Sequence, residues 1–558
     1  MHVPRSEYPR PDFRRNNWLC LNGQWDFSIG ESTFDQTILV PYACEAPLSG
    51  IGDKGFHKTV WYRRTFTLPE AMQGKRILLH FGAVDYICDV WVNGNHVCSH
   101  TGGQVGFEAD ITEVLRDGEN TVQVKVFDDY LDPAMPRGKQ YWELESKGMY
   151  YSRTTGIWQT VWLEAVEPLH LTRCYITPLF DDRAVQFEYQ LSQDAKTLFF
   201  DISFRGEQVA QHAAAYDRRK PIVTVSLAEV WNEDMAWTPE NPSLFDVRIT
   251  VLGDQGVTDV VDAYFGMRKV SVENGKFMLN NRPYYQKLVL DQGYWEESLM
   301  TAPTDEDFIR DIRLTKSMGF NGVRKHQKVE DPRYLYHADR LGLLVWGEIG
   351  SAYIYSKEYV SRIHSEWVEA VLRDYNHPCI VVWTPMNESW GVGNVKTDKA
   401  QQAHCNAMML TTKALDPTRL VLDNDGWEHT YGDLITIHDY TQDGQQLKKQ
   451  FGSLQEILAI RMKPHDKTLF ADGYSYRGQP ILLSEFGGVK NEPADPAQFA
   501  RKYAEVTQAV LESPLIHGYC YTQLTDIENE KNGLLTYGRE PKIPLETICA
   551  INQGTWNE

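Results

Sequence analysis

The segment Ile380-Val-Val-Trp-Thr-Pro-Met-Asn-Glu388 carries the clearest fold signal of the chain. Its first four residues are apolar and are β-branched or aromatic, which predicts a strand buried on both faces. The stretch ends in the polar pair Asn387 and Glu388. Desolvating a carboxylate costs several kcal/mol unless it is paired. Stability therefore explains Glu388 poorly, and a glutamate at the end of a buried strand indicates a functional site.

Residues 269–558 repeat this pattern along their length. Short apolar runs alternate with helical patterns there, which is typical of the βα units of a (β/α)8 barrel. A helix is expected after Thr304, because Thr304 and Asp307 can form a capping box, and it should stop at Gly319. In such a barrel the loops that leave the strands carry the chemistry. The eight strands are expected to end near Asp291, Arg324, Glu348, Glu388, Asp423, His438, Glu485 and Tyr521.

The pattern of the residues before the barrel predicts β-strands and no long helix. In residues 1–165, Asn93-Gly94 separates two runs of β-branched and aromatic residues, which is a strong hairpin signal. In residues 166–268, apolar side chains alternate with polar ones over 185–191 and 245–251, as in half-buried strands. The length of this second segment suits an immunoglobulin-like sandwich.

Composition excludes several classes of function. The 558 residues carry a formal net charge of −20, so no large basic field is available to bind nucleic acid. No apolar run is long enough to span a membrane, and the N-terminus lacks the apolar core of a secretory signal. We therefore expect a cytoplasmic protein, and the nine cysteines, which form no CxxC pair, should be free thiols. The 16 histidines show no metal-ligand spacing and no phosphate loop occurs, so we expect no metal and no cofactor.

Two carboxylates that face each other across a barrel mouth suit glycoside hydrolysis. One protonates the leaving oxygen, and the other attacks the anomeric carbon or activates water. Glu388 and Glu485, which follow the fourth and seventh strands, form the candidate pair. The alternative is that each is a strand-end residue in a salt bridge with Arg324 or Lys325. Glu348, at the third strand, competes with them, and spacing alone does not decide.

At these residues the sequence resembles glycoside hydrolase family 2, which contains β-galactosidases, β-glucuronidases and β-mannosidases. The resemblance implies a jelly-roll-like sugar-binding β-sandwich over residues 1–165, an immunoglobulin-like β-sandwich over 166–268 and a catalytic TIM barrel over 269–558. The segments that carry it are Asn376-His-Pro378, Trp383, Asn387-Glu388, Ser484-Glu-Phe-Gly-Gly488, Asp89-Val-Trp-Val-Asn-Gly94, Thr155-Gly-Ile-Trp158, Val161-Trp-Leu163 and Trp237-Thr-Pro-Glu-Asn-Pro242.

The resemblance also implies a retaining mechanism through a covalent glycosyl-enzyme. Glu485 would be the nucleophile and Glu388 the acid and then the base, with carboxyl groups about 5–5.5 Å apart. At that distance the charge of Glu485 should raise the pKa of Glu388 and keep it protonated for the first step. The family is mostly exo-acting, and a homo-oligomer is possible.

The same resemblance supplies candidate substrate-binding residues. Asn387 would hold the sugar 2-hydroxyl, and His438 and Tyr440 would support the sugar and the nucleophile. The segment Arg324-Lys-His-Gln327 replaces the Arg-x-Ser-His of many members, which leaves the roles of Lys325 and His326 open. The full set of candidates is Asn387, Arg324, His326, His438, Tyr440, Tyr521, Asn529 and Lys531.

The stretch from Asn529 to Lys531 bears on the sugar. It resembles the Asn-x-Lys with which β-glucuronidases bind the sugar carboxylate, although one extra residue precedes Gly533. A hexuronide is therefore the expected substrate. Many β-glucuronidases carry an aspartate where this sequence has Tyr150, so a β-galacturonide is as credible as a β-glucuronide. The alternative is that these three residues lie in a charged surface loop and match the motif by chance. The alternatives are a β-galactosidase and, in another class, a non-catalytic carbohydrate-binding protein.

Overall fold

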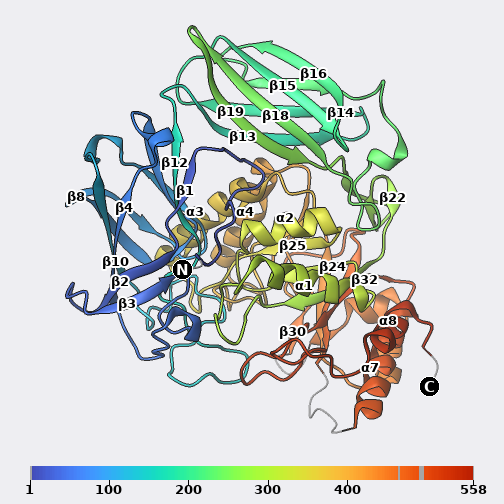
Figure 1. Ribbon diagram of the computed structural model, residues 1–558. Coiled ribbons are helices and arrows are strands. Elements are labelled where there is room, and N and C mark those ends of the chain that lie inside the picture. Colours follow the sequence, from blue (N-terminus) through green and yellow to red (C-terminus); the bar gives the residue numbers. More distant parts are fainter. Residues whose placement is uncertain (1–2, 463–465, 489–494, 557–558) are drawn as a thin grey trace.

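The computed structural model describes residues 3–462, 466–488 and 495–556, and it has three parts (Figure 1). In the first, a six-stranded sheet in the order β3-β2-β4-β10-β7-β8 lies against a four-stranded sheet in the order β1-β12-β5-β9. The strands are β1 (Trp18–Cys20), β2 (Gly23–Ile29), β3 (Gln36–Val40), β4 (Thr59–Thr67), β5 (Arg76–Phe81), β7 (Ile87–Val92), β8 (Asn95–Thr101), β9 (Phe107–Asp110), β10 (Glu119–Phe127) and β12 (Val161–Val166), with β6 (Val84–Asp85) and β11 (Gly156–Ile157) as a separate pair.

The expected hairpin is confirmed. Asn93 and Gly94 join β7 to β8 with φ values of 51° and 82°. Two positive φ values in a two-residue turn match the twist of the flanking strands, which explains the Asn-Gly pair.

The second part is a sandwich of three strands against four, in the orders β13-β14-β17 and β16-β15-β18-β19. Its predicted alternation is confirmed, because Phe187 and Ile249 are fully buried. All nine cysteines are free thiols. The strands are β13 (Leu171–Leu179), β14 (Ala184–Leu191), β15 (Thr197–Phe204), β16 (Glu207–Ala215), β17 (Ile222–Ser226), β18 (Phe245–Gly253) and β19 (Gly256–Phe265).

The third part is the predicted TIM barrel, built on a parallel eight-stranded sheet. Its order is β27-β26-β25-β24-β23-β32-β31-β28, and between β27 and β28 the amide of His438 donates to the carbonyl of Gly426 at 3.3 Å. The fourth strand ends at Thr384, so Glu388 lies in the loop beyond it. The strands are β23 (Gln286–Asp291), β24 (Gly322–Lys325), β25 (Leu344–Glu348), β26 (Ile380–Thr384), β27 (Leu420–Val421), β28 (Ile435–Asp439), β31 (Ile481–Gly487) and β32 (Ile516–Thr522), and the short strands are β20 (Val270–Glu273), β21 (Lys276–Leu279), β22 (Arg282–Pro283), β29 (Arg461–Met462) and β30 (Lys467–Thr468).

Helices cover the outside of the barrel (Figure 1). The predicted capping box of the first helix is confirmed, and Thr304 and Asp307 bond reciprocally at its N-terminus. Phe308 and Ile312 of this helix are buried, and Ile309 is half-buried. The helices are α1 (Asp305–Ser317), α2 (Pro332–Leu341), α3 (Lys357–Asp374), α4 (Lys399–Leu415), α5 (Gly444–Gln450), α6 (Leu454–Leu458), α7 (Pro496–Leu511) and α8 (Leu545–Gln553).

A long loop of the first sandwich packs against the mouth of the barrel. This segment, residues 128–155, is called the β10–β11 loop. The amide of Gly138 donates to the carbonyl of Ser351 at 3.0 Å, and the amide of Ser152 donates to the Glu528 carboxylate at 3.0 Å. Side chains of the first sandwich are therefore held beside the barrel's strand ends.

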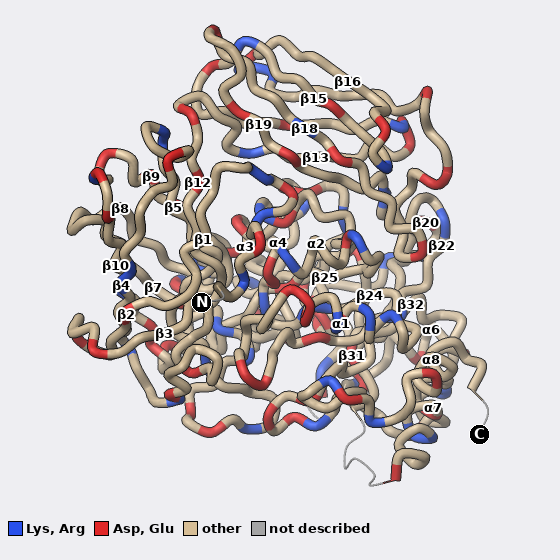
Figure 2. Tube along the Cα trace, in the orientation of Figure 1, with Lys and Arg blue, Asp and Glu red and all other residues tan. Residues whose placement is uncertain are grey.

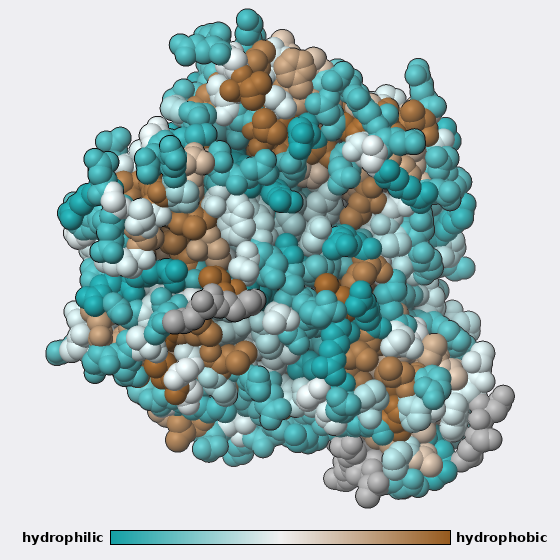
Figure 3. Space-filling model, in the orientation of Figure 1, coloured by the Kyte–Doolittle hydropathy of each residue, from teal (hydrophilic) through white to brown (hydrophobic). Residues whose placement is uncertain are grey.

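The surface carries mixed charge. Acidic and basic residues are interspersed over all three parts of the chain (Figure 2), and the face seen in Figure 3 is mostly hydrophilic, with scattered hydrophobic groups. In the part of the chain that the structure describes, no helix combines the length and the apolar character needed to cross a bilayer.

Candidate active site

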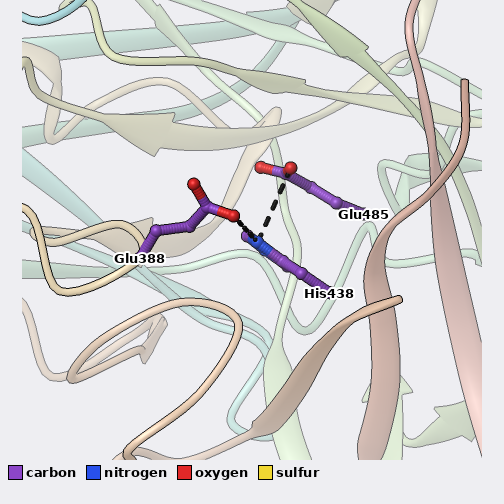
Figure 4. A group of neighbouring side chains, drawn as sticks. All are labelled: Glu388, His438 and Glu485. Atoms are coloured by element: carbon purple, nitrogen blue, oxygen red, sulfur yellow. Dashed lines mark hydrogen bonds and ion pairs between the residues drawn. The ribbon is translucent and has the colours of Figure 1, made fainter. Parts of the chain in front are cut away.

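Three side chains from different strand ends converge in the barrel mouth (Figure 4). Glu388 lies in the loop after β26, His438 lies in β28 and Glu485 lies in β31. Each contributes an oxygen or nitrogen atom within 4.8 Å of those of the other two. The two carboxylates are therefore about as close as those of retaining glycosidases, which stand about 5–5.5 Å apart.

The backbone at Glu388 has an uncommon conformation. Glu388 and Ser389 have φ values of 52° and 59°, in the left-handed region that residues with a Cβ rarely adopt. The amide of Glu388 donates to the carbonyl of Asp425 at 2.9 Å, and that of Ser389 donates to the side chain of Asn424 at 2.9 Å. These bonds stabilise the turn that directs Glu388 toward Glu485, and such strain clusters at functional sites.

Both oxygens of Glu485 are held by hydrogen-bond donors. Arg324 Nη1 donates to Oε1 at 2.8 Å, and the Tyr440 hydroxyl donates to Oε2 at 2.5 Å. Burial, and then the charges of Glu485 and Glu388, raise the pKa of Tyr440 well above its usual value, so the phenol keeps its proton. The structure brings Tyr440 to the nucleophile, as the resemblance implied.

Arg324 lies beneath the site. Its side chain is fully buried and forms ion pairs with Glu348 at 2.9 Å and Asp425 at 2.7 Å, in addition to Glu485. Its Nη2 donates to Asn387 at 2.7 Å. The prediction that Arg324 binds substrate is wrong, because its donors are engaged by protein. It positions the nucleophile.

Glu348 does not compete with the candidate pair. Its side chain is fully buried, and besides the Arg324 ion pair it accepts a hydrogen bond from the Gln327 amide at 2.9 Å. Lys325 turns away from the mouth and pairs with Asp291 at 2.6 Å and Glu330 at 2.7 Å. The salt-bridge alternative therefore describes Glu348 and the Arg324–Glu485 pair, but not Glu388.

His438 connects the two carboxylates. Its Nδ1 lies 2.9 Å from Glu388 Oε1 and 3.5 Å from Glu485 Oε2, and its Nε2 lies 3.2 Å from Asp425. Burial disfavours the imidazolium, but the charges of Glu485 and Asp425 and the bonds to Asp425 and Glu388 outweigh it and raise the pKa of His438 to about 10. The ring is therefore a cation at neutral pH.

This cation reverses the expectation for Glu388. Burial raises the pKa of Glu388, but the hydrogen bond and the charge of His438, followed by the charges of Lys139 and Arg324, outweigh burial and hold the pKa below its usual value. The predicted rise in the pKa of Glu388 is wrong. The prediction considered only the charge of Glu485, whereas in the structure the His438 imidazolium lies between the two glutamates. The proton needed for catalysis belongs to the Glu388–His438 pair.

The raised pKa of His438 predicts a loss of stability at high pH. A pKa raised from 6.5 to about 10 in the folded state adds stability that is complete below pH 6.5 and is lost as pH rises toward 10. The difference in unfolding free energy between the wild type and His438→Gln should shrink over this range when followed by urea denaturation. A difference that stays constant from pH 6.5 to 10 would contradict the cationic assignment.

Two other predicted residues lie in the site. The Asn387 side chain is fully buried, its oxygen accepts from Arg324, and its Nδ2 has no acceptor among residues 3–462, 466–488 and 495–556, so it keeps a donor for a sugar hydroxyl. Burial and the charges of Arg324 and Lys139 hold the pKa of His326 well below its usual value. His326 is therefore neutral and accepts from Arg324 at 3.0 Å.

The structure places Asn529 and Lys531 at the protein surface, on either side of Glu530. Both are exposed, and Asn529 donates to the Ser146 hydroxyl at 2.8 Å. Ile527 and Glu530 close a tight turn that puts Asn529 at its tip, and sugar binding by Asn529 and Lys531 stays a prediction. Glu530 instead is directed inward, where Tyr151 and Asn532 donate to it.

Tyr521 also lies outside the mouth. Its ring contacts Phe486 of β31 and Tyr503 of α7, whose ring centroids lie 5.6 and 4.8 Å away. Side chains alternate along a strand, so Tyr521 of β32 faces the helical layer while Thr522 faces Tyr440, 3.4 Å from its hydroxyl. The prediction that Tyr521 binds substrate is therefore wrong, because the next residue of the strand, Thr522, is the one that faces the mouth.

Sequence reasoning missed an aromatic wall at the mouth. Trp390 contacts Tyr150 and Tyr353, with ring centroids 5.7 and 5.5 Å apart, and all three rings are half-buried. The sequence held two signals for this wall. Trp390 follows Glu388 by two residues, and Tyr150 stands where many β-glucuronidases of the family carry an aspartate. Their faces suit stacking on a sugar ring or an aromatic aglycone.

The remaining missed residues had weaker signals. Asp425 follows the fifth strand and could have been found as a strand-end carboxylate. Lys139 lies in the β10–β11 loop and has no motif, so only the packing of that loop on the barrel reveals it.

The trio Glu388, His438 and Glu485 has the spacing of a metal site. Its contacts are nevertheless those of hydrogen-bonded groups, because an imidazolium lies between the carboxylates and Arg324 and Tyr440 hold Glu485. We assign no metal to it.

Family models match three consecutive segments of the chain. "Glycosyl hydrolases family 2, sugar binding domain" covers residues 33–164, "Glycosyl hydrolases family 2" covers 169–268, and "Glycosyl hydrolases family 2, TIM barrel domain" covers 270–540.

Relatives and solved structures agree with this match. A putative beta-glucuronidase of Formosa agariphila is 28% identical over 441 residues, which are 74% of this chain and 39% of that protein. A beta-galactosidase of Thermoanaerobacter pseudethanolicus is 26% identical over 391 residues, or 67% of this chain and 51% of that protein. The chain thus spans only about two fifths and one half of the lengths of these two relatives. The structure of a beta-D-glucuronidase from Dictyoglomus thermophilum matches with a TM-score of 0.80 at 20% identity, covering 98% of both chains. By its three consecutive domain matches, this chain belongs to glycoside hydrolase family 2.

Proposed function

We propose that the protein is a retaining exo-β-glycosidase that forms a covalent glycosyl-enzyme on Glu485. The observation that carries this proposal is the pair Glu388 and Glu485, with oxygens within 4.8 Å of each other at the mouth of a family 2 barrel. Arg324 and Tyr440 hold both oxygens of Glu485, so a lone pair of the nucleophile is oriented before substrate binds.

In the first step an oxygen of Glu485 forms a bond to the anomeric carbon as the bond from that carbon to the leaving oxygen breaks. The proton held by Glu388 and His438 passes through Glu388 to the leaving oxygen. The charge of Glu485 is the first of the attractions that raise the pKa of His438, and the glycosyl ester removes it. Glu388 then accepts a proton from water, whose oxygen displaces Glu485 from the anomeric carbon.

The substrate class we propose is a terminal β-D-hexuronide, with a β-glucuronide first and a β-galacturonide next. Similarity to proteins named beta-glucuronidase supports it. A β-galactoside is the second candidate. It is favoured by the similarity to a beta-galactosidase and by Glu530, a carboxylate that lies near Glu485 and can accept hydrogen bonds from sugar hydroxyls.

The test is to follow hydrolysis of nitrophenyl β-glucuronide, β-galacturonide and β-galactoside by proton NMR. The expected result is turnover of a uronide faster than of the galactoside, with the β-anomer of the free sugar appearing first. An α-anomer as the first product would overturn the retaining mechanism. A clear preference for the galactoside would contradict the proposed hexuronide specificity and would support a β-galactosidase.

A further inference from the structure

The mouth contains a lysine that the proposed reaction does not use. Lys139 is carried by the β10–β11 loop of the first sandwich and is only 6% exposed. Its Nζ lies 5.2 Å from the ring centroid of Trp390, two residues after Glu388. The chain on either side is anchored, because Tyr151 donates its amide to the Lys139 carbonyl at 2.9 Å and Gly138 bonds to Ser351.

The positive charge of Lys139 acts on the catalytic groups. It helps to lower the pKa values of Glu388 and His326, and it opposes the burial that raises the pKa of Glu530. These three residues follow different strands of the barrel, and the Lys139 ammonium, beside Trp390, is close enough to act electrostatically on all of them.

The other cations of the mouth are engaged. Arg324 is shared among Glu348, Asp425 and Glu485, and His438 is shared between Asp425 and the catalytic pair. By contrast, Lys139 has no carboxylate within ion-pair distance in residues 3–462, 466–488 and 495–556. A nearly buried ammonium without such a partner is costly, and an anion bound there would offset that cost.

We propose that Lys139 binds the carboxylate of the substrate's hexuronic acid and thereby sets the preference for acidic sugars. This inference rests on the proposed function, and it assigns to Lys139 the role that the sequence predicts for the exposed Lys531. Lys139 lies nearly buried beside the aromatic wall at Trp390, and an ammonium at such a partly dehydrated position forms a strong charge-assisted hydrogen bond with a carboxylate.

A rival role is that Lys139 only balances the charge of Glu530. Glu530 accepts from Tyr151 and, at 3.0 Å, from Asn532, and no Lys139–Glu530 ion pair is present among the described residues. The two roles differ in one result. If Lys139 only balances Glu530, the double variant Lys139→Met/Glu530→Gln should regain wild-type uronide turnover. If Lys139 binds substrate, it should not.

The experiment measures kcat/KM of the full chain for nitrophenyl β-glucuronide, β-galacturonide and β-galactoside in the wild type, Lys139→Met and Lys139→Arg. Lys139→Met should lower uronide kcat/KM by about 10- to 100-fold, mainly through KM, because a hydrogen bond to a charged group is lost. A change in the pKa of Glu388 acts on all three substrates alike, so the ratio of uronide to galactoside kcat/KM should fall by about 10-fold or more. Lys139→Arg should recover part of the uronide activity. Lys147→Met, an exposed lysine of the same loop, is the matched control, and a thermal melt checks folding.

Binding of free glucuronate, galacturonate and galactose by calorimetry tests the inference separately from turnover. Wild type should bind a uronate more tightly than galactose, and Lys139→Met should lose that difference. The inference is overturned if Lys139→Met keeps the uronate preference, if wild type has none, or if the double variant regains it. Failure of the proposed function gives a different result, namely no turnover of any β-glycoside, and the calorimetry still decides the role of Lys139.

Discussion

Replacing Glu485 by alanine is expected to lower kcat on the order of 10⁵-fold, because it removes the oxygen that attacks the anomeric carbon. Arg324 and Tyr440 would lose the carboxylate that they orient, but Glu348 and Asp425 remain as counter-ions of Arg324. Steady-state kinetics with the best nitrophenyl substrate give the size of the loss. Azide, entering the space left by the side chain, should restore turnover and give the α-glycosyl azide.

Glu456→Ala, on the exposed surface of α6, is the matched control and should leave kcat unchanged. A thermal melt separates loss of chemistry from loss of folding. Retention of more than about a tenth of wild-type kcat by a folded Glu485→Ala protein would contradict the nucleophile assignment. A protein that only binds carbohydrate would show no turnover to lose, so wild-type kinetics settle that alternative.

Replacing Glu388 by alanine is expected to have the second-largest effect. For substrates with a poor leaving group kcat/KM should fall by about 10²–10⁴-fold, because the leaving oxygen no longer receives a proton. A dinitrophenyl glycoside needs no protonation, so its first step should be nearly normal while breakdown of the glycosyl-enzyme becomes slow. Stopped-flow kinetics should show a burst of dinitrophenol followed by slow turnover.

Azide distinguishes this variant from the first. In Glu388→Ala it should attack the glycosyl-enzyme from the face where water normally enters and give the β-glycosyl azide. A uniform loss for good and poor leaving groups, without a burst, would contradict the acid and base role of Glu388. It would point instead to a role in holding His438, which lies 2.9 Å from its carboxylate.

The features that the sequence predicted well are those with a strong local cause. The Asn93-Gly94 hairpin follows from the φ values that such a turn requires, and the capping box at Thr304 follows from local hydrogen bonding. The pattern of apolar strands ending in polar residues predicted the barrel, and the structure brings Glu388 and Glu485 together at its mouth.

The failures depend on contacts between distant segments. Tyr521 was misplaced because a fully buried strand is apolar on both faces, so its sequence does not tell which face looks into the barrel. In the motif from Asn529 to Lys531 the side chain held by a distant segment is Glu530, to which Tyr151 of the first sandwich donates.

Electrostatics were the hardest property to predict. The pKa of Glu388 is lowered rather than raised because His438, which lies 50 positions away along the chain, donates to it as a cation. Lys139 reaches the same space from another domain, through the packing of the β10–β11 loop on the barrel. Neither contact follows from local sequence spacing.

The covalent bond expected between Glu485 and the sugar can be detected directly. A 2-deoxy-2-fluoro β-glycoside with a dinitrophenyl leaving group, made from the sugar that the wild type hydrolyses fastest, should accumulate as a glycosyl-enzyme. Peptic digestion and mass spectrometry are predicted to place one fluoro-sugar on Glu485. A label on Glu348 or Asp425, or inactivation without any labelled peptide, would contradict the account.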